Sequence, residues 1–250
     1  MLHTATADLT HPASATSGEG VRVFDLTAHG LRALNAALHA VRDTPTNETV
    51  WEIVNTKGAH AIAVGVDAPL DITVRGTTGY YCAGMNKQAT IRIDGSAGPG
   101  VAENMMSGTV IVEGDASQYA GATGRGGLLV IKGNASSRCG ISMKGIDIVV
   151  HGSIGHMSAF MAQTGNLVVL GDAGDALGDS LYEARLFVRG SVKSLGADCI
   201  EKEMRPKHHA LLEDLLRRGL ADGKAKPEEF RRYGSARRLY TFHVDNASSY

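Results

Sequence analysis

The amino-acid sequence predicts an all-β protein, a right-handed parallel β-helix (solenoid) of about seven 19-residue coils with helical caps at both ends. A glycine closes a short strand every 19 residues, without insertion or deletion, and the residues two and four positions before it are aliphatic in every copy. A solenoid is expected because each coil then adds one strand to a continuous sheet. The coil glycines are Gly76, Gly95, Gly114, Gly133, Gly152, Gly171 and Gly190.

The two aliphatic columns indicate strands with one buried face, because alternate residues of a strand point to the same side. We expect the column two before the glycine to form the core ladder, and the column four before it to pack beside that ladder. The core ladder is Val74, Ile93, Val112, Ile131, Val150, Val169 and Val188. The second column is Ile72, Ile91, Val110, Leu129, Ile148, Leu167 and Leu186.

Three further columns complete the coil. The residue before the glycine is polar in six of seven copies, which predicts an outward face. The residue after it is always small and polar, which suits a turn. The position seven after it is always alanine or glycine, which predicts a tight inward turn or close packing between coils. An eighth, imperfect coil is expected before the array, where "WEIVNTKG" and "HAIAVG" resemble strands with glycines out of phase.

Other repeat architectures fit less well. A stack of antiparallel hairpins or propeller blades tolerates loop insertions, and blades need about 40 residues each. The leucine and asparagine ladder of a leucine-rich repeat is missing, and hexapeptide coils would give a period of 18 residues. With strands about 4.8 Å apart, seven rungs make a rod roughly 30 Å long.

Segments with other patterns flank the array. Residues 1–20 have the composition of a disordered arm. Residues 21–60 predict a cap of strand, helix and strand, in which Leu31, Leu34, Leu38 and Val41 follow helical spacing after an N-cap at Thr27. The β-helix is assigned to residues 61–200.

Residues 201–250 predict C-terminal helices and an extended tail. Pro206 is expected to open a helix that carries four leucines between 211 and 216, and Gly219 to close it. A second short helix is expected from Pro227 through "KPEEFRRYG". The aromatic tail that follows suits packing on the rod or against a neighbouring subunit.

Composition excludes several classes of protein. The 250 residues are 43% hydrophobic and 20% charged, which indicates a globular chain. A net charge of −1 predicts no nucleic-acid partner, and no apolar run reaches the roughly 20 residues of a membrane span. The start lacks a secretory signal pattern, so we expect a cytoplasmic protein.

No residue pattern predicts catalysis or a resident metal. "GATGRGG" at 121–127 departs from the phosphate-loop motif and is interpreted as a turn, with Arg125 exposed. His156 follows a turn, and surface histidine is its simplest interpretation. Asp172, Asp175 and Asp179 only faintly resemble a calcium turn. Cys82 and Cys139 share one column three coils apart, beyond disulfide reach, and are expected in the core.

The glycine coil resembles the GXGXG domain of the glutamate synthase family. The resemblance covers roughly residues 50–200 and is carried by the spacing of "GTTGYYCAGMNKQATIRIDGSAGPGVAENMMSGTVIVEGDASQYAGATGRGGLLVIKGNAS". The tail "FRRYGSARRLYTFHVDNASSY" resembles the stand-alone form of this domain in N-methylglutamate synthases, also called methylamine–glutamate N-methyltransferases. These enzymes make N-methylglutamate and ammonia from glutamate and methylamine.

The resemblance implies a non-catalytic β-helix subunit in a cytoplasmic hetero-oligomer. Its partners would be a glutamine amidotransferase-like subunit and an FMN-dependent glutamate synthase-like subunit. The FMN and the iron–sulfur cluster would belong to the second partner, and none of the family's catalytic residues maps onto this chain. The rod would hold the partners in register and wall a tunnel for ammonia or methylamine. Interface or tunnel candidates are Arg125, His156 and Tyr240.

Two other functions stay open from the sequence. Relatives of this domain also occur as the β-helix subunit of formylmethanofuran dehydrogenase and of the formyltransferase/hydrolase complex, which makes formyl transfer the alternative. A stand-alone anion-binding module is the third hypothesis, built on the outward cations Arg75, Lys132, His151 and Arg189.

Overall fold

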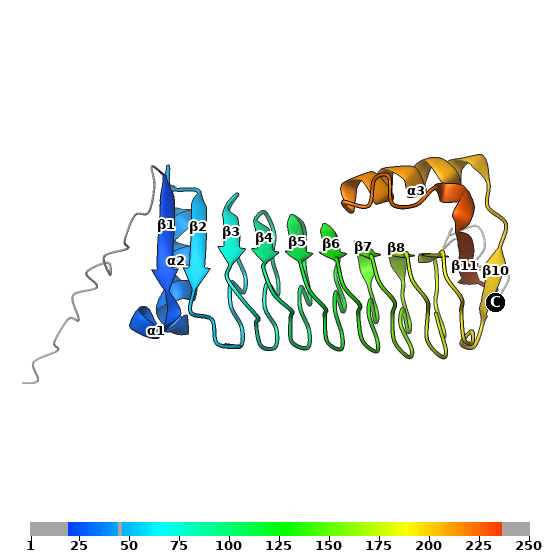
Figure 1. Ribbon diagram of the computed structural model, residues 1–250, viewed down its shortest axis with the longest axis horizontal. Helices are drawn as coiled ribbons and strands as arrows, with labels where there is room; N and C mark the ends of the chain where they lie inside the picture. The colour runs from blue at the N-terminus through cyan, green and yellow to red at the C-terminus, as the bar shows by residue number, and fades with distance from the viewer. Residues whose placement is uncertain (1–19, 45–46, 237–250) are drawn as a thin grey trace, which may run out of the picture.

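The structure, a computed structural model, describes residues 20–44 and 47–236. Residues 1–19 of the expected arm and residues 237–250 of the expected tail, Tyr240 included, lie outside these residues. The fold is a parallel β-helix, as expected, with its rungs side by side along one long axis (Figure 1). One sheet runs in the order β1-β2-β3-β4-β5-β6-β7-β8-β9-β11-β10. The repeating strands are β3 (Asp71–Val74), β4 (Thr90–Ile93), β5 (Thr109–Val112), β6 (Leu128–Ile131), β7 (Lys144–Val150), β8 (Thr164–Val169) and β9 (Arg185–Val188).

The 19-residue period is the register of this sheet. Ile93 pairs with Val112, Val112 with Ile131, and the same column continues in parallel pairing through Val188. All seven side chains of the core ladder are fully buried. The column two residues after the glycine pairs across the coils as well, through isolated bridges from Thr78 to Val192. The two columns enclose a single hydrophobic cluster that fills the rod.

The coil glycines are needed chiefly because the rungs approach closely there. From Gly114 onward each glycine N–H donates to the carbonyl of the glycine one rung earlier, at 2.9–3.1 Å. A Cβ on Gly171 would lie 2.6 Å from the carbonyl carbon of Gly152, closer than real Cβ contacts come. Only Gly76 of the seven has a positive φ, at 100°. Close contact between the backbones of adjacent rungs therefore explains glycine at these positions better than the need for a positive φ does.

The small polar residues after these glycines form a ladder of their own. The Asp115 carboxylate accepts from the Asn134 N–H at 2.7 Å, and the Asn134 amide oxygen accepts from the Ser153 N–H at 2.9 Å. Ser153 then accepts from the Asp172 N–H at 3.0 Å, and Asp172 from the Ser191 N–H at 2.7 Å. Each side chain thus satisfies a corner N–H of the next coil. A residue without a side-chain acceptor would lose this bond.

An N-terminal cap covers the first rung. Strand β1 (Val21–Asp25) pairs in parallel with β2 (Val50–Val54). The chain connects the two strands through two helices, α1 (Leu26–His29) and α2 (Leu31–Asp43). Leu34 and Leu38 of α2 are fully buried against the rod. The expected N-cap at Thr27 is wrong: Asp25 caps α1 and accepts from the Thr27 and Ala28 N–H groups. Thr27 already lies inside that helix, and Gly30 precedes α2.

The expected eighth coil exists, but only one of its two segments is a strand. Strand β2 carries the sequence "VWEIV" and pairs with β3, Val50 opposite Asp71. "HAIAVG" is a turn instead, with Ala61 and Ala63 at φ values of 53° and 52°. It aligns with the inner turn of the next coil, where the Ala83 N–H donates to the Ile62 carbonyl. Ile62 and Ala63 enter the core from this turn rather than from a strand.

The C-terminal segment folds back on the array. Helix α3 (Pro206–Arg218) begins at the expected proline and ends at Gly219, between β10 (Cys199–Lys202) and β11 (Arg231–Ser235). The predicted second short helix is present only as one 3-10 turn, η1 (Pro227–Glu229). The rest of that prediction is wrong, because "RRYGS" forms β11. Strand β11 pairs antiparallel with both β9 and β10. It thereby occupies the open edge of the last parallel rung, which would otherwise expose unpaired backbone groups.

Helix α3 lies over the outer face of the last strands (Figure 1). Leu212, Leu215 and Leu216 pack there in a second hydrophobic cluster, separate from the rod interior. Its sheet side comes from the column three before the glycine, which is polar in the first two coils and then apolar: Thr73, Arg92, Ile111, Val130, Val149, Val168 and Phe187. This switch in one column is the sequence signal that marks where the helix lies.

Candidate interaction surfaces

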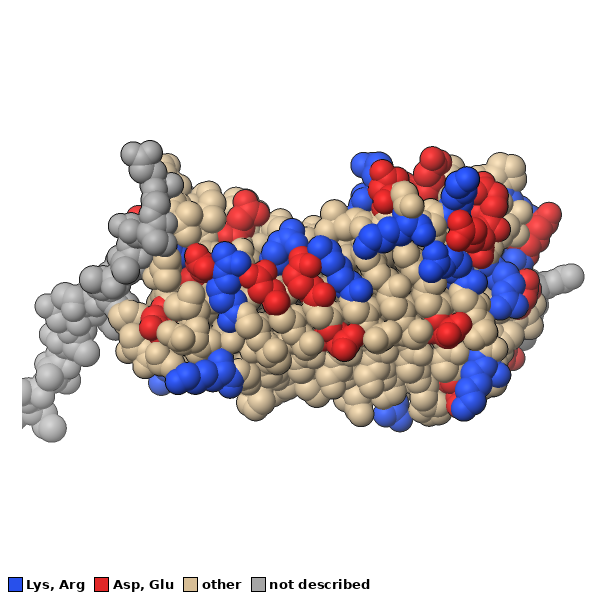
Figure 2. Space-filling view, in the orientation of Figure 1, with Lys and Arg blue, Asp and Glu red and all other residues tan. Residues whose placement is uncertain are grey.

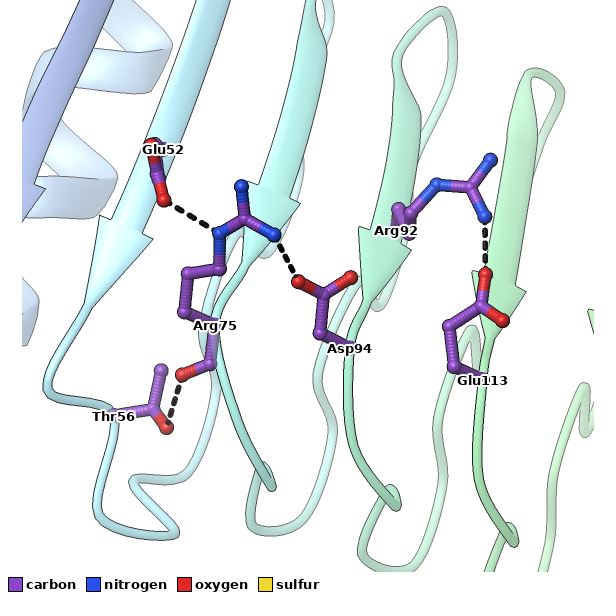
Figure 3. Close-up of polar contacts among 6 residues, drawn as sticks. All are labelled: Glu52, Thr56, Arg75, Arg92, Asp94 and Glu113. Atoms are coloured by element: carbon purple, nitrogen blue, oxygen red, sulfur yellow. Dashed lines mark hydrogen bonds and ion pairs between the residues drawn. The ribbon is translucent and has the colours of Figure 1, made fainter. Parts of the chain in front are cut away.

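Charged side chains form interleaved rows across the outer face of the N-terminal strands (Figure 2). Arg75 bridges Glu52 on the preceding rung and Asp94 on the following one, and Glu113 pairs with Arg92 (Figure 3). Glu113 also pairs with Lys132 on the next rung. The Thr56 hydroxyl also donates to the Arg75 carbonyl at 3.1 Å. The Arg75 side chain is 52% exposed, so each pair adds at most about 1 kcal/mol to stability. The main effect of the alternating charges is that each side chain faces an opposite charge on the adjacent rung.

The outward cations of the third hypothesis do not form an anion site. Arg75 and Lys132 belong to these ion pairs. Arg189 donates to the carbonyls of Leu170 and Lys224 and lies 3.7 Å from Glu229. His151 is held under α3. Each of the four therefore serves contacts within the chain.

His151 ties the end of α3 to the rod. Its Nε2 donates to the Gly219 carbonyl at 2.7 Å, which leaves Nδ1 to accept from the Lys224 ammonium at 3.0 Å. Burial lowers the pKa of His151, and the nearby Lys224 and Lys132 lower it further, against the Gly219 bond and Glu113. A proton on Nδ1 would face an ammonium group. The structure therefore holds this histidine neutral.

Acid should loosen this contact. A histidine with a lowered pKa contributes stability that is present above its unfolded pKa of about 6.5 and lost as the pH falls below it. We expect His151→Gln, whose amide can still donate to Gly219, to lose less stability than the unchanged protein between about pH 7.5 and about pH 5.5. Urea unfolding at the two values measures the difference. Equal losses in both proteins would contradict a role of His151 in this pH dependence. His208 is present in both proteins, so its titration cannot produce a difference between them.

The predicted interface candidates lie on different parts of the coil. Arg125 is exposed on the turn that leads into β6, where its N–H donates to the Met105 carbonyl at 2.7 Å. His156 is exposed on the turn after β7, and its carbonyl accepts from the Arg138 N–H at 2.9 Å. In the described part of the chain, no hydrogen bond or ion pair joins the two side chains. The structure does not bring them into one site.

Residues with potential chemistry serve the packing of the rod. Cys82 and Cys139 are fully buried, and burial raises the pKa of each thiol to about 12, which leaves them as neutral core side chains. Asp175 pairs with Lys193 at 2.7 Å, and Asp179 accepts from the Ala197 N–H at 3.1 Å. Among residues 20–44 and 47–236, no group of three or more His, Cys, Asp or Glu side chains is placed to hold a metal ion.

Exposed and half-buried apolar side chains occur on the turns that precede the strands of the rod. Met85, Met106 and Met161 are 44%, 39% and 42% exposed, and Ile141 and Phe160 are half-buried on neighbouring turns. We name these five residues the methionine edge. Each lies within two residues of a column that is fully buried at Met105 and Met143. None of the described helices is both long enough and apolar enough to cross a membrane.

Comparison with known proteins places the chain in a family. No protein-family model matches the sequence. Protein GlxC of Rhizobium meliloti (strain 1021) is 68% identical over 229 residues, which cover 91% of this chain and 99% of that protein. Identity at this level extends across nearly the whole of both chains. The chain belongs to the GlxC family.

Proposed function

We propose that this chain is the β-helix subunit of a glutamate synthase-like complex, to which it contributes shape and contacts. The supporting observation is that the reactive side chains named above make contacts within the rod itself. Two cysteines are fully buried in the core, the outer ion pairs join successive rungs, and the corner carboxylates accept hydrogen bonds from the next coil. A partner would therefore contact the outer surface of the rod, on which the rungs are regularly spaced. Such a surface can hold other subunits at fixed positions along the rod.

The more specific proposal is a subunit of N-methylglutamate synthase. The complex would convert glutamate and methylamine into N-methylglutamate and ammonia. The partners would be a glutamine amidotransferase-like subunit and an FMN-dependent glutamate synthase-like subunit that also carries the iron–sulfur cluster. The glycine coil and the C-terminal sequence support this proposal through their resemblance to the glutamate synthase family.

A tunnel walled by this chain would run over its outside. One continuous hydrophobic cluster fills the interior of the coils, and its ladder side chains are fully buried. A polar amine such as ammonia or methylamine would lose its hydrogen bonds there. The passage would therefore lie between the rod and a partner subunit, which would shield the amine from solvent.

Affinity purification of the full chain from its native host tests the proposal. We expect an amidotransferase homologue and a flavoprotein with an iron–sulfur cluster to be recovered together with it. The mixture should form N-methylglutamate from glutamate and methylamine, and should lose this activity when the chain is omitted. Recovery with a metal-dependent amidohydrolase-type protein would favour formyl transfer instead. A free monomer at native concentration would contradict both.

Met106→Asp tests the methionine edge as the docking surface for these partners. Exposed methionine packs adaptably against another protein, and a charge there would have to be desolvated on docking. We expect recovery of the partners to fall by about tenfold or more, with no change in the thermal unfolding of the isolated chain. Gln118→Asp, an exposed change elsewhere on the coil, is the matched control. Full recovery with Met106→Asp would place the partners on another face.

A further inference from the structure

The C-terminal cap forms a cavity, open to solvent, that the β-helix repeat does not build. It has a volume of about 510 Å³ and lies between the last parallel rung, β10, the start of α3, and β11. The pairing of β11 with β9 and β10 brings residues of these strands together, and the first turn of α3 completes the lining. Its lining holds five cations and one acid: Arg185, Lys202, Arg205, Lys207, Arg232 and Glu183.

The cations of this cavity differ from those on the outer strands. Arg75 and Lys132 each have a carboxylate partner on an adjacent rung. Within the described residues, by contrast, the structure shows no ion pair for Arg185, Lys202 or Lys207. The chain as a whole has a net charge of only −1, so this local excess does not reflect a generally basic surface.

Arg232 is held in place on the cavity wall. Its Nε and Nη2 both donate to the Glu203 carbonyl, at 3.1 and 2.9 Å, which orients the guanidinium. Burial lowers its pKa, and the neighbouring Arg185 and Arg205 lower it further. Glu203 also pairs with Arg205 at 3.1 Å, and is the nearby acid that offsets this repulsion. Like charges gathered in this way favour a bound anion, which would relieve their repulsion.

His208 adds a neutral donor to the same wall. The side chain is 6% exposed, and its Nδ1 accepts from the Arg205 N–H at 3.1 Å. The neutral ring therefore carries its proton on Nε2. Burial lowers the pKa of His208, and the cations Arg232, Lys207, Arg185 and Arg205 lower it further. An imidazole that lines a cationic cavity and keeps one N–H can donate to an oxyanion.

We propose that this cavity binds a small oxyanion with at least two negative charges, from the phosphate or the dicarboxylate class. The cavity volume falls in the range typical of small-molecule sites, about 300–1,000 Å³. Guanidinium groups fit the paired oxygens of either class. The inference rests on the cavity alone and holds whatever complex the chain joins.

Calorimetric titration of the full chain with inorganic phosphate and, separately, with glutarate tests the site. We expect saturable binding of at least one of the two anions. Arg185→Gln should weaken that binding by about tenfold, because a charged hydrogen bond is lost from the site while no described contact of the fold is removed. Arg32→Gln, an exposed change on α2 at the far end of the rod, should bind as the unchanged protein does.

The two titrations separate the ligand classes, since preference for phosphate or for glutarate assigns the site to one of them. Absence of saturable binding for both would overturn the proposal. Equal weakening by Arg185→Gln and Arg32→Gln would also overturn it, because it would indicate a diffuse charge effect. Binding of a glutamate-rich peptide without binding of either small anion would identify a protein-contact surface instead, and would likewise contradict a small-molecule site.

Discussion

Replacement of Val112 by aspartate is expected to abolish cooperative folding of the rod. Val112 is fully buried in the middle of the core ladder, between Ile93 and Ile131 on the adjacent rungs. An unpaired carboxylate there has no partner and no water, and its burial costs several kcal/mol at least. That is comparable with the whole stability of a typical domain, about 5–15 kcal/mol. Circular dichroism during urea unfolding would show the loss of a single sharp transition.

An aspartate substituted on the outside of the same coil is the control. Gln118 is exposed on the turn after the strand, and Gln118→Asp should keep the transition within about 0.5 kcal/mol of the unchanged protein. If Val112→Asp also retains a sharp transition at an unchanged urea midpoint, Val112 does not face the interior. The assignment of inward and outward columns would then be wrong.

Gly171→Ala is expected to destabilise the rod more than glycine-to-alanine changes do elsewhere. The added Cβ would lie 2.6 Å from both the carbonyl carbon and the carbonyl oxygen of Gly152, and backbone atoms cannot move aside as a flexible side chain does. The rungs would have to separate at this corner, where Gly171 donates to Gly152 at 2.9 Å. Overpacking of this kind costs about 3 kcal/mol. The urea midpoint measures the loss.

Gly234→Ala is the matched control, because its Cβ would meet no atom closer than 3.5 Å and its backbone has no positive φ. It should change stability by less than about 1 kcal/mol. Equal effects from the two substitutions would indicate that lost backbone freedom, rather than contact between rungs, explains glycine at the coil corners.

The repeating part of the fold could be predicted because its information is local and recurs. Ile93, Val112 and Ile131 occupy the same place in consecutive coils, so one alternating pattern indicates both the strand and its partner. Constant spacing then leaves one register for the sheet. The glycines were recognisable for the same reason, although their stacking as the principal cause required the distances between rungs.

The caps were less predictable, because their elements depend on what lies beside them. "FRRYG" has a sequence compatible with a short helix, yet Arg232 and Tyr233 pair with the open edge of β9. "HAIAVG" resembles a strand, yet Ala61 and Ala63 take left-handed backbone angles, and the turn that they form buries Ile62 and Ala63 in the core. In both segments the neighbouring rung decides the structure, and the local pattern is overruled.

The candidate sites divide in the same way. Arg125 and His156 were identified as exposed, and both are exposed, but they lie on different turns of the coil. Arg185, Lys202 and Arg232 carried no motif, since they are distant in sequence and meet only in the C-terminal cavity. The pairing of β11 with β9 and β10 brings them together.

The sequence by itself determined the solenoid, its 19-residue coil and its buried ladder, because identical columns stack on themselves and need no distant partner. The tertiary structure alone decided how the ends close. It placed α3 over Val149, Val168 and Phe187, and it inserted β11 at the edge of the last rung. Those contacts involve segments that do not repeat. The switch in the column three before the glycine marks the face that α3 covers, but no periodic pattern records α3 or β11 themselves. The physical reason is that a repeat specifies its neighbours, whereas a cap is specified by the surface that it covers.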